Sequence, residues 1–291
     1  MSSPGGGRKG DFLPYKAPIN KILDHTLVDG PGNRTAVFFQ QCNIDCKYCH
    51  NPETKNLCRH CGICVGQCPA NALKAENGRV IWDPWICVNC DTCIRVCPYH
   101  SSPKVAEKTV DEVFHAIQEN LPFIRGITVS GGECTLYLEF LRELFVKCKE
   151  IGLTCLIDSN GTVPLWNTPV MEVCDGVMLD VKAWSAERFF ALTGADNRMV
   201  KENLRELAKM DKLEEIRIVC LEGWVDAAEV IHGIAESVPG RIREKTLLKL
   251  IRFRNAGVTG ELKEAVMPSL AYMKELQEIA MGCGFRNIKV V

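Results

Sequence analysis

Residues 42–49 of the chain read Cys-Asn-Ile-Asp-Cys-Lys-Tyr-Cys, so Cys42, Cys46 and Cys49 are spaced C-x3-C-x2-C. A four-iron cube takes four thiolates, one for each iron. Three cysteines that hold such a cluster leave one iron open, and an open iron can bind a substrate or cofactor, as the vacant position of a catalytic zinc does. The spacing therefore predicts a catalytic iron-sulfur cluster at these residues.

Two sets of four cysteines follow, and both match C-x2-C-x2-C-x3-C-P, the run that ligates paired four-iron clusters in bacterial ferredoxins. In that arrangement the fourth cysteine of each run crosses to the other cluster. Zinc and disulfides are the alternatives, but zinc ribbons lack the Cys-Pro ending and a disulfide framework needs an oxidising compartment. We expect one cluster on Cys58, Cys61, Cys64 and Cys97, and the other on Cys87, Cys90, Cys93 and Cys68.

Composition limits the partners and the compartment. The 291 residues carry a formal net charge of -1, which argues against nucleic acid as the main partner because phosphate binding needs surplus Lys and Arg. No apolar run approaches the ~20 residues that span a bilayer, and the N-terminus lacks the apolar core of a secretory signal. We therefore expect a soluble, cytoplasmic protein with no membrane partner, in which residues 1–10 form a flexible leader.

Apolar strand-like runs alternate with helical patterns outside the cysteine-rich stretch. We expect strands at residues 36–40, 127–130, 153–157, 176–181, 216–221, 246–253 and 288–291, and helices at 110–120, 136–151, 201–209, 227–237 and 270–281. This alternation favours right-handed βαβ units and a parallel sheet. The predicted fold class is α/β, a partial (β/α)6 TIM-like barrel formed by residues 1–53 and 104–291, with a ferredoxin-like insert at 54–103.

Polar residues cluster at the predicted carboxyl ends of strands, where a parallel sheet places its ligand site. Each group alone reads as an ordinary turn, but their recurrence downstream of an open-iron motif indicates a site. Adjacent glycines let the backbone approach a ligand, Glu133 can accept from an ammonium, and Asp158 or Asn160 can accept from ribose hydroxyls. Such a site suits a nucleoside that bears an amino acid. The groups are Gly131-Gly132-Glu133, Asp158-Ser159-Asn160-Gly161, and Asp180 with Lys182.

These motifs together resemble the glycyl radical enzyme activating enzymes, which are radical S-adenosylmethionine (SAM) enzymes with a partial or complete (β/α) barrel. The resemblance runs from about Ile19 to the end of the chain, and the two-cluster insert makes the sequence most similar to the YjjW-type subgroup. It rests on residues 28–34 (Val-Asp-Gly-Pro-Gly-Asn-Arg), 48–52 (Tyr-Cys-His-Asn-Pro), 130–133 (Ser-Gly-Gly-Glu), 158–161 (Asp-Ser-Asn-Gly) and 178–182 (Met-Leu-Asp-Val-Lys).

The resemblance implies an oxidoreductase with three [4Fe-4S] clusters and SAM as cofactors. The cluster on Cys42, Cys46 and Cys49 would cleave SAM reductively, and the 5'-deoxyadenosyl radical would take a hydrogen from a glycine of a partner protein. The further site residues implied are Tyr48 and His50 beside the adenine, Gly131, Gly132 and Glu133 at the methionine amino group, and Asp158, Ser159, Met178, Asp180, Val181 and Lys182 around the carboxylate, with a monovalent cation as an optional component.

One position departs from the family pattern, because Arg254 aligns with a histidine that family members usually carry near the sixth strand's end. Arginine is permanently charged and has no acceptor, so it cannot act as a neutral imidazole, although it can pair with a carboxylate or the ribose. Cys134 follows Glu133 and could face the site, but we favour a packing role for it.

Two questions stay open from the sequence. The insert clusters could relay electrons from a ferredoxin or flavodoxin, or the insert could shape the surface on which the partner docks. The activity could be activation of a glycyl radical protein by a monomer that docks transiently, a radical SAM reaction on a small molecule or peptide, or electron transfer alone. The electron-transfer reading leaves the three-cysteine motif without a purpose, so we favour activation.

Overall fold

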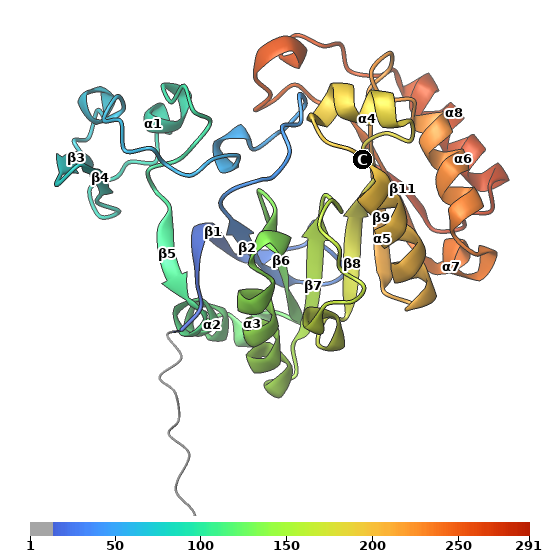
Figure 1. Ribbon diagram of the computed structural model, residues 1–291, viewed down its shortest axis with the longest axis horizontal. Helices are drawn as coiled ribbons and strands as arrows, with labels where there is room; N and C mark the ends of the chain where they lie inside the picture. Colours follow the sequence, from blue (N-terminus) through green and yellow to red (C-terminus); the bar gives the residue numbers. More distant parts are fainter. Residues whose placement is uncertain (1–13) are drawn as a thin grey trace, which may run out of the picture.

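Residues 14–291 are described by a computed structural model of the chain, and over this range the main feature is a nine-stranded sheet (Figure 1). Its strand order is β11-β10-β9-β8-β7-β6-β2-β1-β5. The strands from β11 to β2 run parallel, and β1 and β5 are antiparallel additions at one edge. The predicted α/β class with a mostly parallel sheet is therefore confirmed. The leader predicted at residues 1–10 lies outside the described residues.

All seven predicted strands occur, with ends that differ from the prediction by at most three residues. Most of them are buried apolar runs, as expected for parallel strands that helices cover. The parallel strands are β2 (Arg34–Phe39), β6 (Gly126–Gly131), β7 (Thr154–Ser159), β8 (Gly176–Asp180), β9 (Leu213–Cys220), β10 (Leu247–Arg252) and β11 (Ile288–Val290).

Helices connect consecutive parallel strands. The predicted start of α2 is confirmed by a capping box, in which the Thr109 side chain accepts from the Glu112 amide while Glu112 accepts from the Thr109 amide. The α-helices outside the insert are α2 (Val110–Gln118), α3 (Leu138–Glu150), α4 (Ala186–Thr193), α5 (Arg198–Lys209), α6 (Ala227–Ser237), α7 (Gly240–Lys245) and α8 (Leu270–Gly282), and short 3-10 turns include η1 (Pro52–Thr54), η4 (Cys134–Tyr137) and η6 (Gly260–Leu262).

The sequence pattern did not reveal the last two strands of the sheet, β1 (Lys16–Thr26) and the edge strand β5 (Ala106–Thr109), or helices α4 and α7. β1 contains Pro18 and charged residues in place of an apolar run, because its solvent side needs no apolar residues. β5 and α7 are too short for a periodic pattern to stand out.

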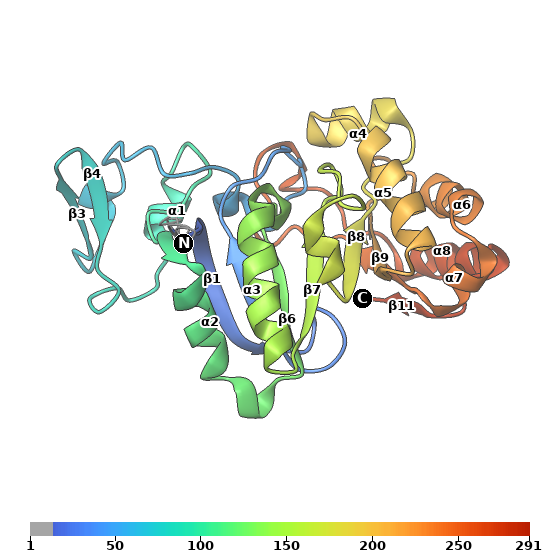
Figure 2. The same ribbon diagram turned by 60° about the horizontal axis from the view of Figure 1, so that its bottom comes forward.

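The insert has a small core of its own and lies at the end of the molecule opposite α6, α7 and α8 (Figures 1 and 2). Its elements are η2 (Val65–Gln67), the hairpin β3 (Leu73–Glu76) and β4 (Arg79–Trp82), and the one-turn helix α1 (Thr92–Arg95). Only Cys64, Leu73, Val80 and Cys93 are buried together there. So few apolar contacts leave most of the insert's stability to other bonds, as in domains that metal ions hold together.

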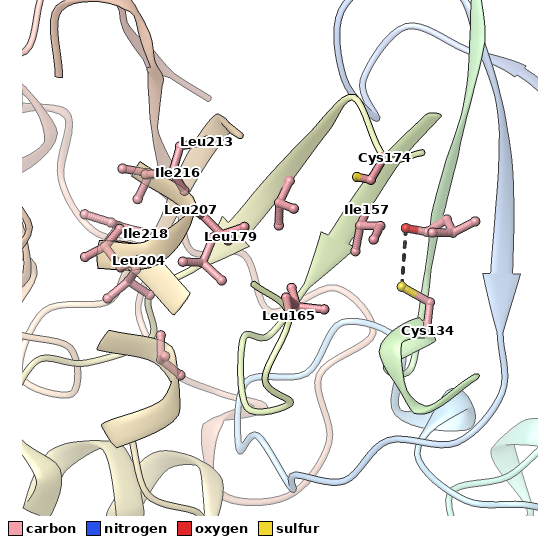
Figure 3. Close-up of a cluster of buried hydrophobic side chains, with 14 of the residues drawn as sticks. Cys134, Ile157, Leu165, Cys174, Leu179, Leu204, Leu207, Leu213, Ile216 and Ile218 are labelled. Atoms are coloured by element: carbon pink, nitrogen blue, oxygen red, sulfur yellow. Dashed lines mark hydrogen bonds between the residues drawn. The ribbon is translucent and has the colours of Figure 1, made fainter. Parts of the chain in front are cut away.

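The main core lies between the parallel strands and the covering helices, and Figure 3 shows part of it, with Ile157, Leu179 and Ile216 from β7, β8 and β9 facing the helical layer. Cys134 belongs to this core, since it is fully buried and its thiol lies 3.6 Å from the Val129 carbonyl. Packing therefore accounts for Cys134. Among residues 14–291, no helix combines the length and apolar character that crossing a membrane would require.

Candidate active site

A cavity of about 250 Å³ opens at the carboxyl ends of the parallel strands, between the sheet and the loop of residues 42–51, called here the cysteine loop. Most of the predicted site residues meet there. The lining residues are Cys42, Ile44, Cys46, Tyr48, Cys49, His50, Asn51, Ser130, Gly131, Gly132, Glu133, Asp158, Ser159, Asn160, Asp180, Lys182, Arg217, Val219 and Ile251.

Main-chain hydrogen bonds hold the cysteine loop on two sides. On one side the Cys42 amide donates to the Lys55 carbonyl at 2.9 Å. On the other side the amides of Asp45 and Lys47 donate to carbonyls at the end of α4, at 2.8 and 2.9 Å. These bonds fix the backbone of the loop without using any thiol, so the three cysteine side chains remain available as ligands.

The three thiols fit a positively charged metal centre. Burial raises the pKa of Cys42 to about 12 and that of Cys46 to about 11, and it also raises the pKa of Cys49. Thiolates in this environment need a neighbouring cation, and a metal that binds them drives off their protons. Within residues 14–291, no three His, Cys, Asp or Glu side chains converge closely enough for a single metal ion. A cube instead takes each thiolate at a different iron, which these spread thiols allow.

Gly131 and Gly132 let β6 pass close to the cysteine loop. A Cβ on Gly132 would lie 2.1 Å from the Gln41 carbonyl oxygen, and one on Gly131 would lie 2.3 Å from backbone atoms of Phe39. Gly131 also has φ +117°, which side chains other than hydrogen rarely permit. The glycine pair therefore brings the end of β6 against the end of β2 and against Gln41, the residue that precedes the cysteine loop.

Glu133 ties the ends of β6 and β7 together. Its buried carboxylate accepts from the Thr135 amide and hydroxyl, from the Ser159 hydroxyl at 2.9 Å and from the Asn160 amide at 2.7 Å. Burial raises the pKa of Glu133, while these four hydrogen bonds lower it. Most of its acceptor capacity is spent inside the protein, and one oxygen keeps room for another donor.

A line of buried charges crosses the inner face of the sheet. The Arg217 guanidinium donates to Asp158 at 2.8 Å and pairs with Glu215, and Glu215 pairs with the Lys249 ammonium at 2.7 Å. Burial raises the pKa of Asp158, and Arg217 opposes that rise. Arg217 lines the cavity, so the sheet supplies a fixed positive charge there that our sequence reasoning missed.

Asp180 and Lys182 form an ion pair at 2.8 Å across the end of β8. Burial alone would lower the pKa of Lys182, but the Asp180 carboxylate and the Cys46 thiol raise it well above its usual value. The ammonium lies 5.8 Å from the centre of the Tyr48 ring. Lys182 thus stays charged beside the three cysteines.

Two aromatic side chains complete the wall. The Tyr48 hydroxyl is buried and has no partner among the described residues, as expected of a group whose partner is a ligand. His50 lies 2.7 Å from the Arg254 carbonyl through Nε2. A carbonyl only accepts, so this nitrogen carries the proton and Nδ1 is free to accept.

Three predicted site residues lie away from the cavity wall. Met178 is fully buried, with its sulfur 3.2 Å from an Arg217 nitrogen. Val181 is buried, and its amide donates to the Arg217 carbonyl. The Arg254 side chain is exposed, and only its carbonyl approaches the site. The roles of these three residues remain predictions.

The insert cysteines divide between two small cavities. Cys58, Cys61, Cys64 and Cys97 line one of them, while Cys68, Cys87, Cys90 and Cys93 line the other. Cys93 also touches the first cavity. The same two groups of four were expected from the sequence, and their assignment to two clusters stays a prediction. All 17 cysteines are free thiols, so the disulfide alternative finds no support.

The chain is similar in sequence and fold to known proteins. Residues 36–232 match the Radical SAM superfamily. The choline trimethylamine-lyase activating enzyme of Oleidesulfovibrio alaskensis is 34% identical over 246 residues, covering 77% of this chain and 79% of that protein. A Haemophilus influenzae protein assigned by name to the glycyl-radical enzyme activating enzymes is 26% identical over 298 residues, covering 94% and 96%. QueE from Escherichia coli shares the fold, with a TM-score of 0.56, 14% identity and coverage of 95% and 94%.

Proposed function

Because the chain belongs to the radical SAM superfamily, and within it to the glycyl radical enzyme activating enzymes, we propose that it installs a radical on a glycine of a partner protein. When bound and reduced, a [4Fe-4S] cluster with an open iron would supply the electron that cleaves SAM to methionine and the 5'-deoxyadenosyl radical, which abstracts the glycine hydrogen and becomes 5'-deoxyadenosine. The observation that carries the assignment is that Cys42, Cys46 and Cys49 line the same cavity as the polar strand ends.

Within this cavity the chain's own residues hold and orient the cofactors. The three thiolates hold the cluster, and the main-chain bonds of the cysteine loop keep them in place. Lys182, kept charged by Asp180, pairs with the methionine carboxylate of SAM. The remaining acceptor of Glu133 receives the methionine amino group, beside the close backbone of Gly131 and Gly132.

The aromatic residues hold the nucleoside. Tyr48 lies at the adenine and its unpartnered hydroxyl donates to the cofactor. His50 offers Nδ1 as an acceptor because Arg254 occupies the other ring nitrogen. Ser159 and Asn160 stay anchored through Glu133, so the loop that faces the ribose is preorganised.

The segment from Met178 to Lys182 also shapes the carboxylate end of the site. Asp158, Ser159, Met178 and Asp180 are our candidates for the surroundings of the methionine carboxylate, with a monovalent cation as an optional component, and Asp158 and Met178 both contact Arg217. Val181 contributes through its backbone, which is fixed to β9. The positive charges at this end of the cavity are Lys182 and Arg217.

We also propose that the insert, residues 54–103, holds two further [4Fe-4S] clusters of the YjjW-type arrangement. The support is the division of its eight cysteines between two cavities. Such clusters suit a relay from a low-potential donor, a ferredoxin or flavodoxin. A cytoplasmic monomer that meets its donor and its glycyl radical partner transiently fits this role.

The test of the proposed activity is anaerobic reconstitution of the full chain with iron, sulfide, a reductant and SAM. Formation of 5'-deoxyadenosine is expected, together with a glycyl radical doublet on a candidate partner in electron paramagnetic resonance (EPR) spectra. Replacing Cys46 by Ser should abolish both, while replacing the buried Cys220, which packs away from the cavity, should abolish neither. Deoxyadenosine without a doublet on any glycyl radical protein would favour a small-molecule or peptide substrate instead.

The crossed ligation is tested by counting iron in double variants. Replacing any one of the four cysteines that hold a cluster should remove about four irons per protein, the content of one cube. The pair Cys58→Ser and Cys97→Ser should lose no more than one single variant, because both belong to one cluster. The pair Cys58→Ser and Cys87→Ser should lose about twice as much. Equal losses for the two pairs would contradict the crossed assignment.

A further inference from the structure

Lys55 follows the cysteine loop in the chain and bonds back to it, and it is not among the residues that line the cavity. Its carbonyl accepts from the Cys42 amide at 2.9 Å, and its ammonium donates to the Cys46 carbonyl at 3.1 Å. The same ammonium forms an ion pair with Asp45. One residue therefore holds the segment from Cys42 to Cys46 at both ends, through its main chain and its side chain.

Neighbouring bonds keep Lys55 in position. The next residue, Asn56, donates from its side chain to the Tyr99 carbonyl at 2.9 Å and from its amide to the His100 carbonyl at 3.2 Å. The buried Gln40 side chain donates to the Asn56 carbonyl at 2.6 Å. The main chain at Lys55 and Asn56 is therefore fixed to Gln40, the residue after β2, and to residues 99 and 100 at the other end of the insert.

The charges around Lys55 are unequal in their exposure to water. The Lys55 side chain is 12% exposed, whereas that of its partner Asp45 is 81% exposed. Water screens an exposed carboxylate far more than a buried ammonium. On the cavity side, Lys182 is paired with Asp180. The net effect at Cys46 is a fixed positive charge that its counter-ion only partly offsets.

We propose that Lys55 is a positioning residue that also sets the reduction potential of the cluster on Cys42, Cys46 and Cys49. Reduction adds one negative charge to a cluster, and a buried cation nearby stabilises that charge. Lys55 raises the potential, and Asp45 lowers it to a smaller extent. This inference rests on the proposed function, because it requires a cluster at these three cysteines.

The experiment is a redox titration of the reconstituted full chain followed by EPR. Addition of SAM identifies the signal of the open-iron cluster, because only that cluster binds it. In Lys55→Met, the ratio of reduced to oxidised cluster at a given applied potential should fall about tenfold, which is about 59 mV for a one-electron couple. Lys55→Arg should restore most of the wild-type potential, and Asp45→Asn should shift the potential upward.

Lys47→Met is the matched control. Lys47 lies in the same loop, but its ammonium pairs with Glu261 at 2.9 Å and its side chain is 38% exposed. Its removal should leave the potential unchanged. A shift as large as that of Lys55→Met would mean that any loop lysine suffices, which would overturn the specific role of Lys55.

The outcomes separate the inference from the proposed function. A SAM-sensitive signal whose potential does not move in Lys55→Met refutes the inference and leaves the activase assignment intact. Absence of any SAM-sensitive signal in the wild-type protein refutes the activase assignment itself. If Lys55→Met fails to retain its cluster, Asp45→Asn decides, because its exposed side chain is not needed for folding; a potential that does not rise then refutes the inference.

Discussion

Replacing Arg217 by Met should destabilise the protein by leaving a buried carboxylate without its counter-ion. Arg217 is 11% exposed, and it binds Asp158 at 2.8 Å, Glu215 and the Met178 sulfur at once. Glu215 would keep Lys249 as a partner at 2.7 Å. Among residues 14–291, the Asp158 carboxylate would keep only the Ser130 hydroxyl as a hydrogen-bond donor, at 2.9 Å. Most of the loss in stability should therefore come from the unpaired carboxylate of Asp158.

The expected magnitude is that of breaking a buried ion pair by removing one partner, about 3–5 kcal/mol. We expect the lower end, about 3 kcal/mol, because Glu215 retains an ion pair and Asp158 a hydrogen bond. For a chain of this size that corresponds to a fall in Tm of roughly 6–12 °C. Arg217→Lys keeps the charge but not the two-armed geometry, so it should lie between wild type and Arg217→Met.

The loss of stability in Arg217→Met should increase as pH rises. Burial raises the pKa of Asp158 in the folded protein, and Arg217 opposes the rise. Without Arg217 this folded-state pKa is higher still. A carboxyl whose pKa is raised on folding stabilises the fold at low pH and loses that contribution as pH rises through the folded pKa. The Tm difference between wild type and variant should therefore grow as pH rises from the ordinary range of an aspartate pKa.

The assay is an anaerobic thermal scan of the cluster-loaded proteins at one fixed rate, with iron content measured beforehand. Arg198→Met is the control, because Arg198 also binds an aspartate at 2.8 Å but is 88% exposed. It should leave Tm unchanged. An equal loss in both variants, or a gap that narrows as pH rises, would refute the argument that an uncompensated buried Asp158 causes the effect.

Other perturbations give further expected outcomes. Glu133→Gln replaces a carboxylate that accepts four hydrogen bonds with an amide that has only one acceptor oxygen. It should lower the free energy of unfolding by about 1–3 kcal/mol and raise the Kd for SAM, measured by equilibrium dialysis. Glu139→Gln, at an exposed position, should change neither quantity. Gly132→Ala should prevent cluster loading, measured as iron content, because its Cβ would meet the Gln41 carbonyl at 2.1 Å; Gly282→Ala, with open space around it, should load normally.

The central fold was predictable because its signals are strong. Long apolar runs alternating with amphipathic helices indicate covered parallel strands, and α2 and α6 begin at the residues expected. β1 was not predictable in the same way, because an antiparallel strand with one face in water needs no continuous apolar run. Its antiparallel pairing with β2 depends on a contact that no local pattern encodes.

Some residues of the site were also predictable from the sequence, and others were not. Cys42, Cys46, Cys49 and the glycines could be identified because cluster ligation and close backbone approach demand particular residue types at particular spacings. Arg217 was missed although a signal exists, since Glu215 and Arg217 alternate with Ile216 and Ile218 in an otherwise buried strand. Charges on the inner face of a parallel strand need partners, and that need points to a ligand cavity.

Arg254 shows why residue identity alone misjudges such positions. The alignment concerns a side chain, and an arginine in place of a histidine suggests a changed contact. In the structure the carbonyl of Arg254 meets His50 at 2.7 Å while its side chain is exposed. A carbonyl is the same in every residue, so this contact survives the substitution. Side-chain chemistry read from sequence is thus informative where the side chain points into the cavity, as at Lys182, and uninformative where the backbone does the binding.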